Sequence, residues 1–262
     1  MRAEDYPYFD APFLAFAHRG GPLLPENVGR ENSLHAFVRA VDLGYRYLET
    51  DVHATADGVL VAFHDDRLDR ATDGTGLIAD LPWAEVQQAR IGGLEPIPTM
   101  AEVFETFPGV RFNIDIKSPT AVLPLVEAIV AHRAQQRVCV TSFGGDRLAA
   151  FRRRMGTHVA TGMSRFEVAR TRFVPLLPRL GPAPGVVLQV PVRSTIAGRQ
   201  VPIVTPGLIR TAHATGRQVH VWTIDEPDEM HRLIDLGVDG LISDRIDVLR
   251  EVLIDRGLWW EG

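Results

Sequence analysis

The sequence predicts a single (β/α)8 barrel, and three observations lead to that fold class. Short apolar runs alternate with longer amphipathic stretches almost to the end of the chain, as expected for repeated strand–helix units. About eight such units can be counted, the number that closes a parallel sheet into a barrel. The 262 residues, 45% of them hydrophobic, suffice for one large core, so we expect one domain over residues 1–262. A doubly wound open sheet is the alternative architecture.

The predicted strands are short runs of apolar or β-branched residues bounded by turn residues. They cover residues 13–18, 45–53, 59–64, 110–117, 137–142, 158–163, 185–190, 218–224 and 239–243. Helices are predicted near residues 31–44, 99–109, 120–134, 145–154, 226–235 and 245–256. Typical end signals support them, because Gly44 ends the first helix and Thr99 caps the second. The proline-rich stretch 173–184 predicts an irregular loop at the rim of the barrel.

Charge and cysteine content exclude several classes of function. A formal net charge of -5 argues against general binding to nucleic acids or anionic membranes. The one cysteine, Cys139, cannot form a disulfide within the chain and lies in an apolar run, so we expect a buried thiol in a reducing compartment. No apolar run approaches the length of a membrane span and no secretory signal is visible, so a cytoplasmic location is expected.

Acidic side chains gather where predicted strands end. Glu49, Asp51 and His53 alternate along one strand and therefore share a face of it. Carboxylates crowded together repel each other unless a cation, a proton or water compensates. Asp115 lies near the end of another strand, and the carboxyl ends of all barrel strands meet at one face. Three carboxylates there supply hard oxygen ligands, which suit Mg²⁺ or Ca²⁺ better than Zn²⁺.

Basic residues and histidines are expected at the same face of the barrel. Lys117 shares the face of Asp115, and Arg19 follows the first strand with a planar group that matches a phosphate. His18 and His64 end their own apolar runs and can supply a general base and a general acid. Each of these residue types alone is more often structural. Together they predict phosphoryl-transfer chemistry.

Short motifs along the chain occur in an order shared with a known family. They are "AHRG" (17–20), "ENSLHAF" (31–37), "ETDVHATADGVLVAFHD" (49–65), "LDRATDGTG" (68–76), "IPTMAEVF" (97–104), "NIDIK" (113–117) and "VWTID" (221–225). Over about residues 13–250 the chain resembles the glycerophosphodiester phosphodiesterases. The resemblance implies a (β/α)8 barrel with its active site at the carboxyl ends of the strands. It further implies hydrolysis of small glycerophosphodiesters to sn-glycerol 3-phosphate and an alcohol, with one divalent cation, Mg²⁺, Ca²⁺ or Mn²⁺.

The resemblance assigns roles to nine residues of this sequence. The roles are catalysis for His18 and His64, metal binding for Glu49, Asp51 and Asp115, phosphate binding for Arg19 and Lys117, and orientation of Arg19 and the metal shell for Glu31 and Asn32. Asp115 stands where the family often has glutamate, which leaves the preferred metal open. The first loop holds a second pair, Glu26 and Asn27, which is the alternative alignment for Glu31 and Asn32.

Three further residues have less direct interpretations. Trp222 is predicted to line the cavity as an apolar wall for the glycerol or the leaving group, and a place in the core is an equal alternative. His53 is interpreted as a neighbour of the site rather than a metal ligand. Arg193 follows the predicted strand 185–190, and a position away from the mouth of the cavity is favoured over one at it.

Two other functions and two chemical routes stay open. A lipid-directed phosphodiesterase, of the lysophospholipase D or sphingomyelinase D kind, would use residues 173–184 and 258–260 to contact an acyl chain, although a packed rim loop and a core or dimer patch are favoured there. A catalytically silent barrel that binds phosphodiesters or a protein partner is disfavoured, because no predicted site residue is lost. The attacking group is either water or the substrate's own glycerol 2-hydroxyl, which would give a cyclic phosphate. The oligomeric state is not predicted.

Overall fold

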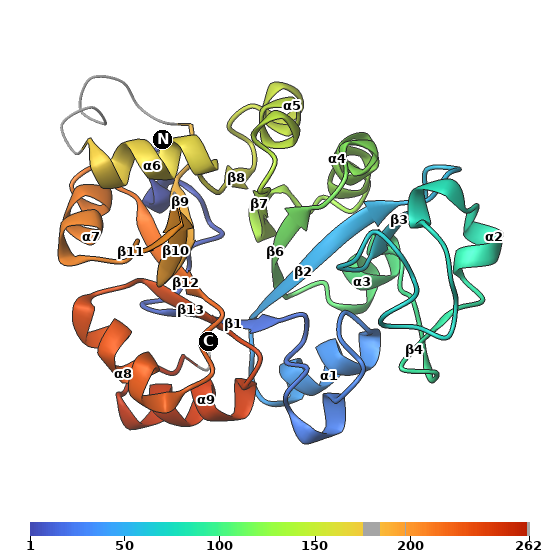
Figure 1. Ribbon diagram of the computed structural model, residues 1–262, viewed down its shortest axis with the longest axis horizontal. Helices are drawn as coiled ribbons and strands as arrows, with labels where there is room; N and C mark the ends of the chain where they lie inside the picture. Colours follow the sequence, from blue (N-terminus) through green and yellow to red (C-terminus); the bar gives the residue numbers. More distant parts are fainter. Residues whose placement is uncertain (175–183, 197, 261–262) are drawn as a thin grey trace.

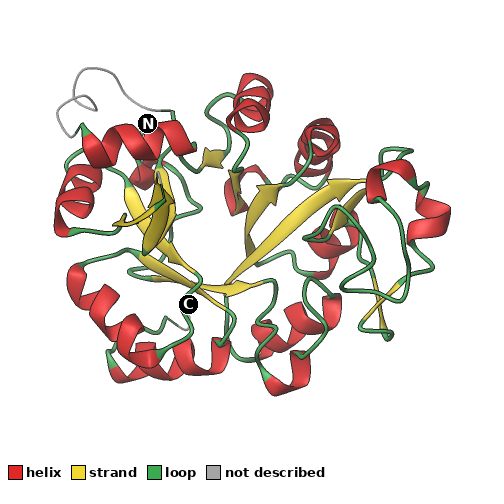
Figure 2. Cartoon of the chain, viewed as in Figure 1, coloured by secondary structure: helices red, strands yellow, loops and turns green. Residues whose placement is uncertain are grey.

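The centre of the molecule is a barrel of parallel strands, seen in a computed structural model that describes residues 1–174, 184–196 and 198–260 (Figures 1 and 2). The barrel strands are β1 (Leu14–His18), β2 (Tyr47–Ala54), β6 (Arg111–Ile116), β7 (Val138–Thr141), β8 (Ala160–Thr161), β9 (Val187–Pro191), β12 (Gln218–Trp222) and β13 (Gly240–Ser243). They pair in the order β8-β7-β6-β2-β1-β13-β12-β9. A parallel bridge between Gly162 and Val187 joins the two ends, so the barrel is nearly closed. The predicted (β/α)8 barrel is confirmed.

Helices surround the barrel on the outside (Figure 1). They are α1 (Leu34–Asp42), α3 (Met100–Thr106), α4 (Val122–Ala131), α5 (Gly145–Met155), α6 (Arg165–Phe173), α7 (Pro206–His213), α8 (Pro227–Leu236) and α9 (Ile246–Asp255). The short helix α2 (Trp83–Val86) lies apart from them, in the segment after β3 (Leu60–Ala62) (Figure 1). Single 3-10 turns occur at Ala3–Asp5, Pro25–Asn27, Ile78–Asp80, Pro119–Ala121 and Gln135–Arg137. Thr99 caps α3 as predicted, since its hydroxyl accepts from the Glu102 N–H and the Glu102 carboxylate accepts in return from the Thr99 N–H.

The apolar run at 59–64 forms a hairpin strand rather than a strand of the barrel. β3 (Leu60–Ala62) runs antiparallel to β2, with Ala62 opposite Val52. A parallel neighbour requires a crossover of a dozen or more residues, and the turn at Asp57 and Gly58 is too short for one. The segment after β3 includes the antiparallel pair β4 (Arg90–Ile91) and β5 (Glu95–Pro96) and has an apolar cluster of its own. The hairpin thereby leads the chain back along β2 to Asp51, whose carbonyl accepts from the Phe63 N–H at 2.9 Å, and His64 follows directly.

Some structure on either side of the predicted strand 185–190 was not predicted. α6 and the exposed hairpin of β10 (Arg193–Ile196) and β11 (Arg199–Pro202) lie there. The predicted strand 158–163 is regular only over β8. Of the predicted rim loop 173–184, Phe173 is the last residue of α6, and 175–183 lie outside the described residues.

The apolar interior involves two features that the sequence analysis singled out, Cys139 and the C-terminal residues 258–260. Cys139 is fully buried in β7, and burial raises the pKa of its thiol, so this residue is an inert part of the core. At the C-terminus, the Trp259 ring packs on Tyr45 with centroids 5.0 Å apart, near the start of β2 and so at the end of the barrel away from the predicted site.

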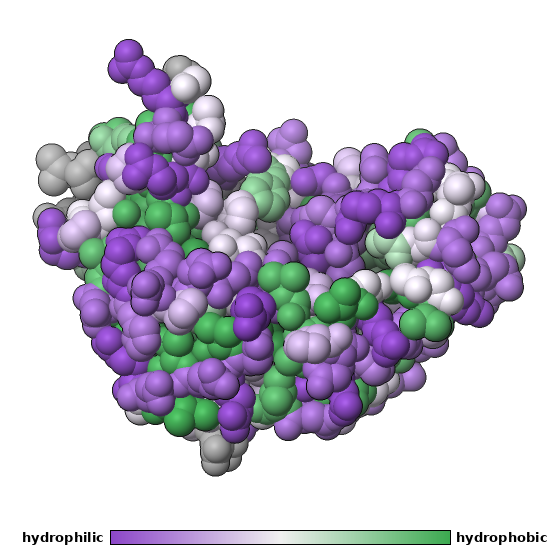
Figure 3. Space-filling model, turned by 60° about the horizontal axis from the view of Figure 1, so that its bottom comes forward, coloured by the Kyte–Doolittle hydropathy of each residue, from purple (hydrophilic) through white to green (hydrophobic). Residues whose placement is uncertain are grey.

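No helix in the described ranges is long and apolar enough to cross a membrane. Figure 3 shows a largely polar face with small apolar patches among the charged groups.

Candidate active site

A cavity of about 160 Å³ opens at the carboxyl ends of the barrel strands. Its lining residues come from most of the barrel strands and the loops that follow them. They are His18, Arg19, Glu49, Asp51, His64, Asn113, Asp115, Lys117, Thr141, Phe143, Gln189, Trp222, Thr223 and Ile242. Every residue that the sequence predicted for catalysis, metal binding or phosphate binding is therefore present in one cavity.

The three carboxylates are neighbours because their strands are. β2 and β6 pair in parallel with Asp51 opposite Asp115, and Glu49 lies two residues before Asp51 on the same face. All three are buried, with at most 6% of each residue exposed. The Lys117 ammonium lies between two of them, 2.8 Å from both Asp51 Oδ1 and Asp115 Oδ2. Arg19 approaches from the other side, with its Nε 3.3 Å from Asp51 Oδ2.

Burial and neighbouring charges shift the pKa values of the three carboxyl groups. Burial, reinforced by the charge of Asp51, raises the pKa of Glu49 from 4.5 to about 7. Burial also raises the pKa of Asp115. Burial works in the same direction on Asp51, but Lys117 and Arg19 outweigh it and lower the pKa of that carboxyl. The site therefore holds one firmly ionised carboxylate and two that gain from a further positive charge.

His18 is held from both sides at the end of β1. Its Nδ1 lies 2.6 Å from Asp244 Oδ1, and its Nε2 lies 3.7 Å from Glu49 Oε2. Burial opposes the charged imidazolium, but Glu49 and Asp244 outweigh burial and raise the pKa of His18. Asp244 is itself fixed, since its backbone N–H donates to Asp225 Oδ1 at 2.8 Å. The pairing at Nδ1 directs Nε2 of this histidine toward the carboxylate cluster.

His64 has a matching aspartate on the opposite side of the cavity. Its Nδ1 lies 2.6 Å from Asp65 Oδ1. Arg70 then donates to Asp65 Oδ2 at 2.5 Å and to Glu31 Oε1 at 2.6 Å, and Glu31 accepts from Arg19 at 3.3 Å. The hydrogen bond from Arg70 lowers the pKa of Asp65 to about 2, so Asp65 stays ionised beside the imidazole. Arg70 thus connects the orientation of His64 with that of Arg19.

The first loop places Arg19 through an obligatory glycine. Gly20 has φ +84°, and a Cβ there would lie 2.7 Å from Ala36 Cβ, so the turn after β1 requires glycine. Asn32, from the predicted second pair, donates to Asp51 Oδ2 at 3.2 Å. Asn27, from the alternative pair, donates instead to the Gly20 carbonyl at 2.8 Å and so supports the turn. The structure therefore brings Glu31 and Asn32 to the site, directly behind Arg19 and Asp51.

His53, Trp222 and Arg193 also have defined places. His53 is buried, and its ring lies 3.1 Å from the His64 carbonyl, outside the cavity lining. Burial lowers its pKa, so it acts as a neutral support for the His64 backbone. Trp222 lines the cavity, with its ring edge-on to Phe143 at a centroid distance of 5.5 Å. Arg193 begins the exposed hairpin, where it donates to the Gln200 carbonyl at 3.3 Å, and it does not line the cavity.

Sequence reasoning missed the partners of the two histidines. Asp65 and Arg70 lie within motifs quoted above, and their closeness to His64 in sequence was an available signal. Asp244 follows β13 at the carboxyl face, where functional groups of barrels gather. It is 226 residues from His18 in sequence, and a contact over that separation has no local signal.

The carboxylates fit a divalent cation by their chemistry. They offer hard oxygen donors, and Asp115 Oδ1 is buried without a hydrogen-bond partner. Among the described residues, however, no three His, Cys, Asp or Glu side chains converge on an ion position as they stand. The Lys117 ammonium lies between Asp51 and Asp115 and balances their charge. A cation would therefore take over part of the neutralisation that Lys117 supplies.

Fold and site together define a barrel enzyme that cleaves phosphoric diesters. A sequence model described as the glycerophosphoryl diester phosphodiesterase family matches residues 18–248. The chain belongs to that family.

Similar proteins cover nearly the whole chain. The Mycobacterium tuberculosis protein named "Probable glycerophosphodiester phosphodiesterase 2" is 40% identical over 95% of this chain and 97% of its own. The glycerophosphodiester phosphodiesterase of Caldanaerobacter subterraneus is 31% identical over 90% of this chain and 96% of its own. The human protein named lysophospholipase D GDPD1 is 30% identical over 90% of this chain and 85% of its own.

A solved structure shares the barrel. The phosphodiesterase of Oleispira antarctica, determined in complex with the product sn-glycerol-3-phosphate, matches with a TM-score of 0.78 and 24% identity. The match covers 95% of this chain and 99% of that chain. At this level of identity the likeness concerns the fold.

Proposed function

We propose that the protein hydrolyses glycerophosphodiesters to sn-glycerol 3-phosphate and an alcohol in the cavity described above. The observation that carries the proposal is the convergence of two aspartate-paired histidines, three buried carboxylates and two basic groups on one cavity. The names of the relatives and the product bound to the Oleispira antarctica enzyme support this substrate class. A catalytically silent barrel would have lost part of this set.

The basic groups bind and orient the phosphodiester. Arg19 and Lys117 line the cavity and carry charges that complement the phosphate oxygens. Glu49, Asp51 and Asp115 would hold one divalent cation, Mg²⁺, Ca²⁺ or Mn²⁺, which supplies positive charge to stabilise the developing charge on the phosphoryl group. Asn32 holds Asp51, and Glu31 holds Arg19, so the first loop fixes both sets of groups relative to each other.

The histidines move the protons. Each has its Nδ1 occupied by an aspartate, which fixes the ring and leaves Nε2 for the reaction. One histidine accepts the proton of the attacking oxygen, and the other donates a proton to the leaving alkoxide. The attacker is water or the glycerol 2-hydroxyl of the substrate. Phosphorus NMR during turnover by weakened histidine variants separates the two, because only the second route passes through a cyclic phosphate.

Paired histidine variants test this proposal. We expect His18→Ala and His64→Ala each to lower kcat for glycerophosphocholine by on the order of 10²–10⁴. His213→Ala is the matched control, because His213 is an exposed histidine on α7 paired with Asp239, and it does not line the cavity. Near-normal turnover in both cavity variants would remove the histidines from the mechanism.

A further inference from the structure

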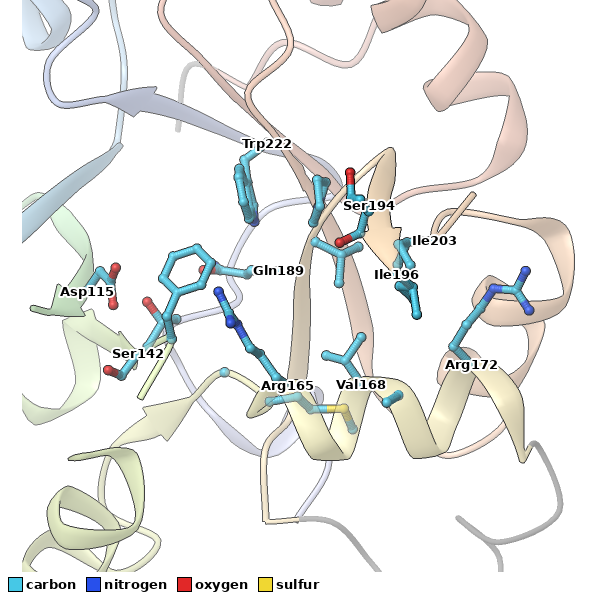
Figure 4. A pocket seen from close by; sticks show the side chains of 18 of the residues that line it. Asp115, Ser142, Arg165, Val168, Arg172, Gln189, Ser194, Ile196, Ile203 and Trp222 are labelled. Carbon is cyan, nitrogen blue, oxygen red and sulfur yellow. The ribbon is translucent and has the colours of Figure 1, made fainter. Parts of the chain in front are cut away.

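A second and larger cavity adjoins the catalytic one. Its volume is about 570 Å³, within the range of small-molecule sites. The two cavities share five lining residues, Asp115, Thr141, Phe143, Gln189 and Trp222. Figure 4 shows Asp115 at one end of this space, with Ile196 and Ile203 toward the other. A molecule with its phosphate in the catalytic cavity can therefore extend directly into the second one.

The walls of this second cavity, called the groove below, are mainly apolar. They come from α6, from β9 and from the hairpin of β10 and β11 with the residue that follows it. The apolar lining consists of Phe143, Met163, Val168, Ala169, Phe173, Val190, Pro191, Ile196, Ile203 and Trp222. Among the described residues that line the groove, the only carboxylate is Asp115, at the shared end. The polar lining besides Asp115 consists of Thr141, Ser142, Arg165, Arg172, Gln189, Ser194 and Thr195 (Figure 4). A cationic choline or ethanolamine group would therefore meet one carboxylate and two arginines, whereas an aliphatic chain would be desolvated along the apolar wall.

The passage between the cavities is aromatic. The rings of Phe143 and Trp222 meet edge-on at 5.5 Å. The Lys117 ammonium lies 5.7 Å from the Phe143 ring centroid, and the Arg165 guanidinium lies 5.1 Å from it. Phe143 thus lies between Lys117, in the catalytic cavity, and Arg165, which enters the groove from α6 (Figure 4). A substrate that is charged at one end and aliphatic at the other matches this change of surroundings.

At the outer end of the groove, the described lining combines apolar side chains with Arg172 (Figure 4). Phe173 and Ile196 line it and are 49% and 43% exposed, respectively. Covering such side chains with an apolar ligand removes their apolar surface from water, which favours binding. Among the residues that the structure describes, the groove therefore offers exposed apolar wall to a chain at this end.

We propose that the groove binds one aliphatic chain of the substrate, so that the enzyme acts on phosphodiesters of glycerol that carry a single long chain. This inference rests on the proposed function of the adjoining cavity. The chain is attached either to the glycerol, as in a lysophospholipid, or to the leaving alcohol. Both present the same chemistry to the groove, and substrate series distinguish them.

Two chain-length series test the proposal. One consists of 1-acyl-glycerophosphocholines and the other of glycerophosphoalkanols, all kept below their critical micelle concentrations, with glycerophosphocholine as the chain-free reference. In the series that uses the groove, kcat/KM is expected to rise roughly three- to fourfold for each methylene buried, and to level off once the groove is filled. The series that rises identifies the end that carries the chain. Flat profiles in both series would overturn the proposal.

Substitutions in the groove separate chain binding from catalysis. Ile196→Asp adds a charge at an exposed wall position away from the catalytic residues, and Val168→Trp fills the groove from α6. Each is expected to lower kcat/KM for a dodecyl-chain substrate at least tenfold and to leave glycerophosphocholine turnover within twofold. Phe166→Asp is the matched control, because Phe166 is 76% exposed on α6 and does not line the groove. An equal loss in this control would assign the effect to the general surface and overturn the proposal.

A binding measurement keeps this test apart from the proposed function. The His18→Ala variant in chelator is titrated with dodecylphosphocholine below its critical micelle concentration by calorimetry. If the chain binds in the groove, this variant should bind dodecylphosphocholine measurably. The affinity should fall at least tenfold when Ile196→Asp is added and should stay unchanged when Phe166→Asp is added. Absence of binding, or equal binding in all three proteins, would overturn the groove assignment whatever the activity assays show.

Discussion

The negative charge of Glu49 lowers the stability of the folded protein, so stability should depend on pH in a direction and by an amount that the structure predicts. Glu49 is 6% exposed and shares its face of β2 with Asp51. Its pKa is raised from 4.5 to about 7, by burial and by Asp51. A carboxyl group with a raised pKa binds its proton more tightly in the folded state than in the unfolded state. The folded protein therefore loses stability as the pH rises from about 4.5 through about 7.

The size of the effect follows from the same values. One pKa unit corresponds to about 1.4 kcal/mol, so the rise from 4.5 to about 7 corresponds to an upper limit between about 3 and 4 kcal/mol above pH 7. Glu49→Gln removes the charge but keeps an oxygen that can accept from the Arg19 N–H, which now donates to Glu49 Oε2 at 3.3 Å. For a chain of this size, each kcal/mol changes Tm by roughly 2–4 °C. We expect Glu49→Gln to raise Tm by up to about 10 °C at pH 8 and to leave it nearly unchanged at pH 4.5.

The assay is thermal unfolding of both proteins in chelator across this pH range, repeated with Mg²⁺, Ca²⁺ or Mn²⁺. A cation bound at a hundred times its Kd stabilises the folded wild type by about 2.7 kcal/mol, and the variant should gain much less. The advantage of the variant in chelator should therefore disappear when the correct ion is added. A variant that is less stable than wild type at pH 8 in chelator, or that gains as much from the ion, would refute the reasoning.

Three further predictions concern the surroundings of the site. Arg70→Met should lower kcat about tenfold, because Asp65 and Glu31 lose the half-exposed guanidinium that donates to both. Arg70→Lys should recover only part of the lost activity, because an ammonium lacks the planar fork of donors, and full activity in both variants would refute this link. Asp244→Asn should lower the pKa of His18, because the Asp244 carboxylate contributes to raising that pKa. Histidine titration by NMR in chelator measures the change, and an unchanged or higher pKa in the variant would contradict the prediction. Cys139 should resist thiol reagents until the protein unfolds, and rapid labelling of the native protein would contradict its burial.

The barrel could be predicted from the sequence because its strands and helices differ in hydrophobic period. Each barrel strand is a short apolar run, and the helices between carry end signals such as Thr99 and Gly44. α6 was missed because it carries three arginines and one glutamate in nine residues and buries few of the others. The hairpin of β10 and β11 was missed because it is largely exposed and lacks the alternation of a half-buried strand.

The site residues could be anticipated to the extent that they lie at strand ends. Glu49, Asp51 and Asp115 follow from alternation and from the common face of a barrel, and the structure places them side by side. The pairing of His18 with Asp244 depends on which strands are neighbours in the closed barrel. The groove depends on how α6 and the hairpin lie against β9, and no local pattern encodes that arrangement.

The most direct test of the central claim is release of sn-glycerol 3-phosphate from glycerophosphocholine by metal-stripped protein, before and after addition of Mg²⁺, Ca²⁺ or Mn²⁺. The same measurement is made on Glu49→Gln, whose fold is checked by its Tm. We expect no release without metal, release with at least one ion, and a loss of that release in the variant. Full release in chelator, or no release with any ion from folded wild-type protein, would contradict a metal-assisted phosphodiesterase site built on Glu49, Asp51 and Asp115.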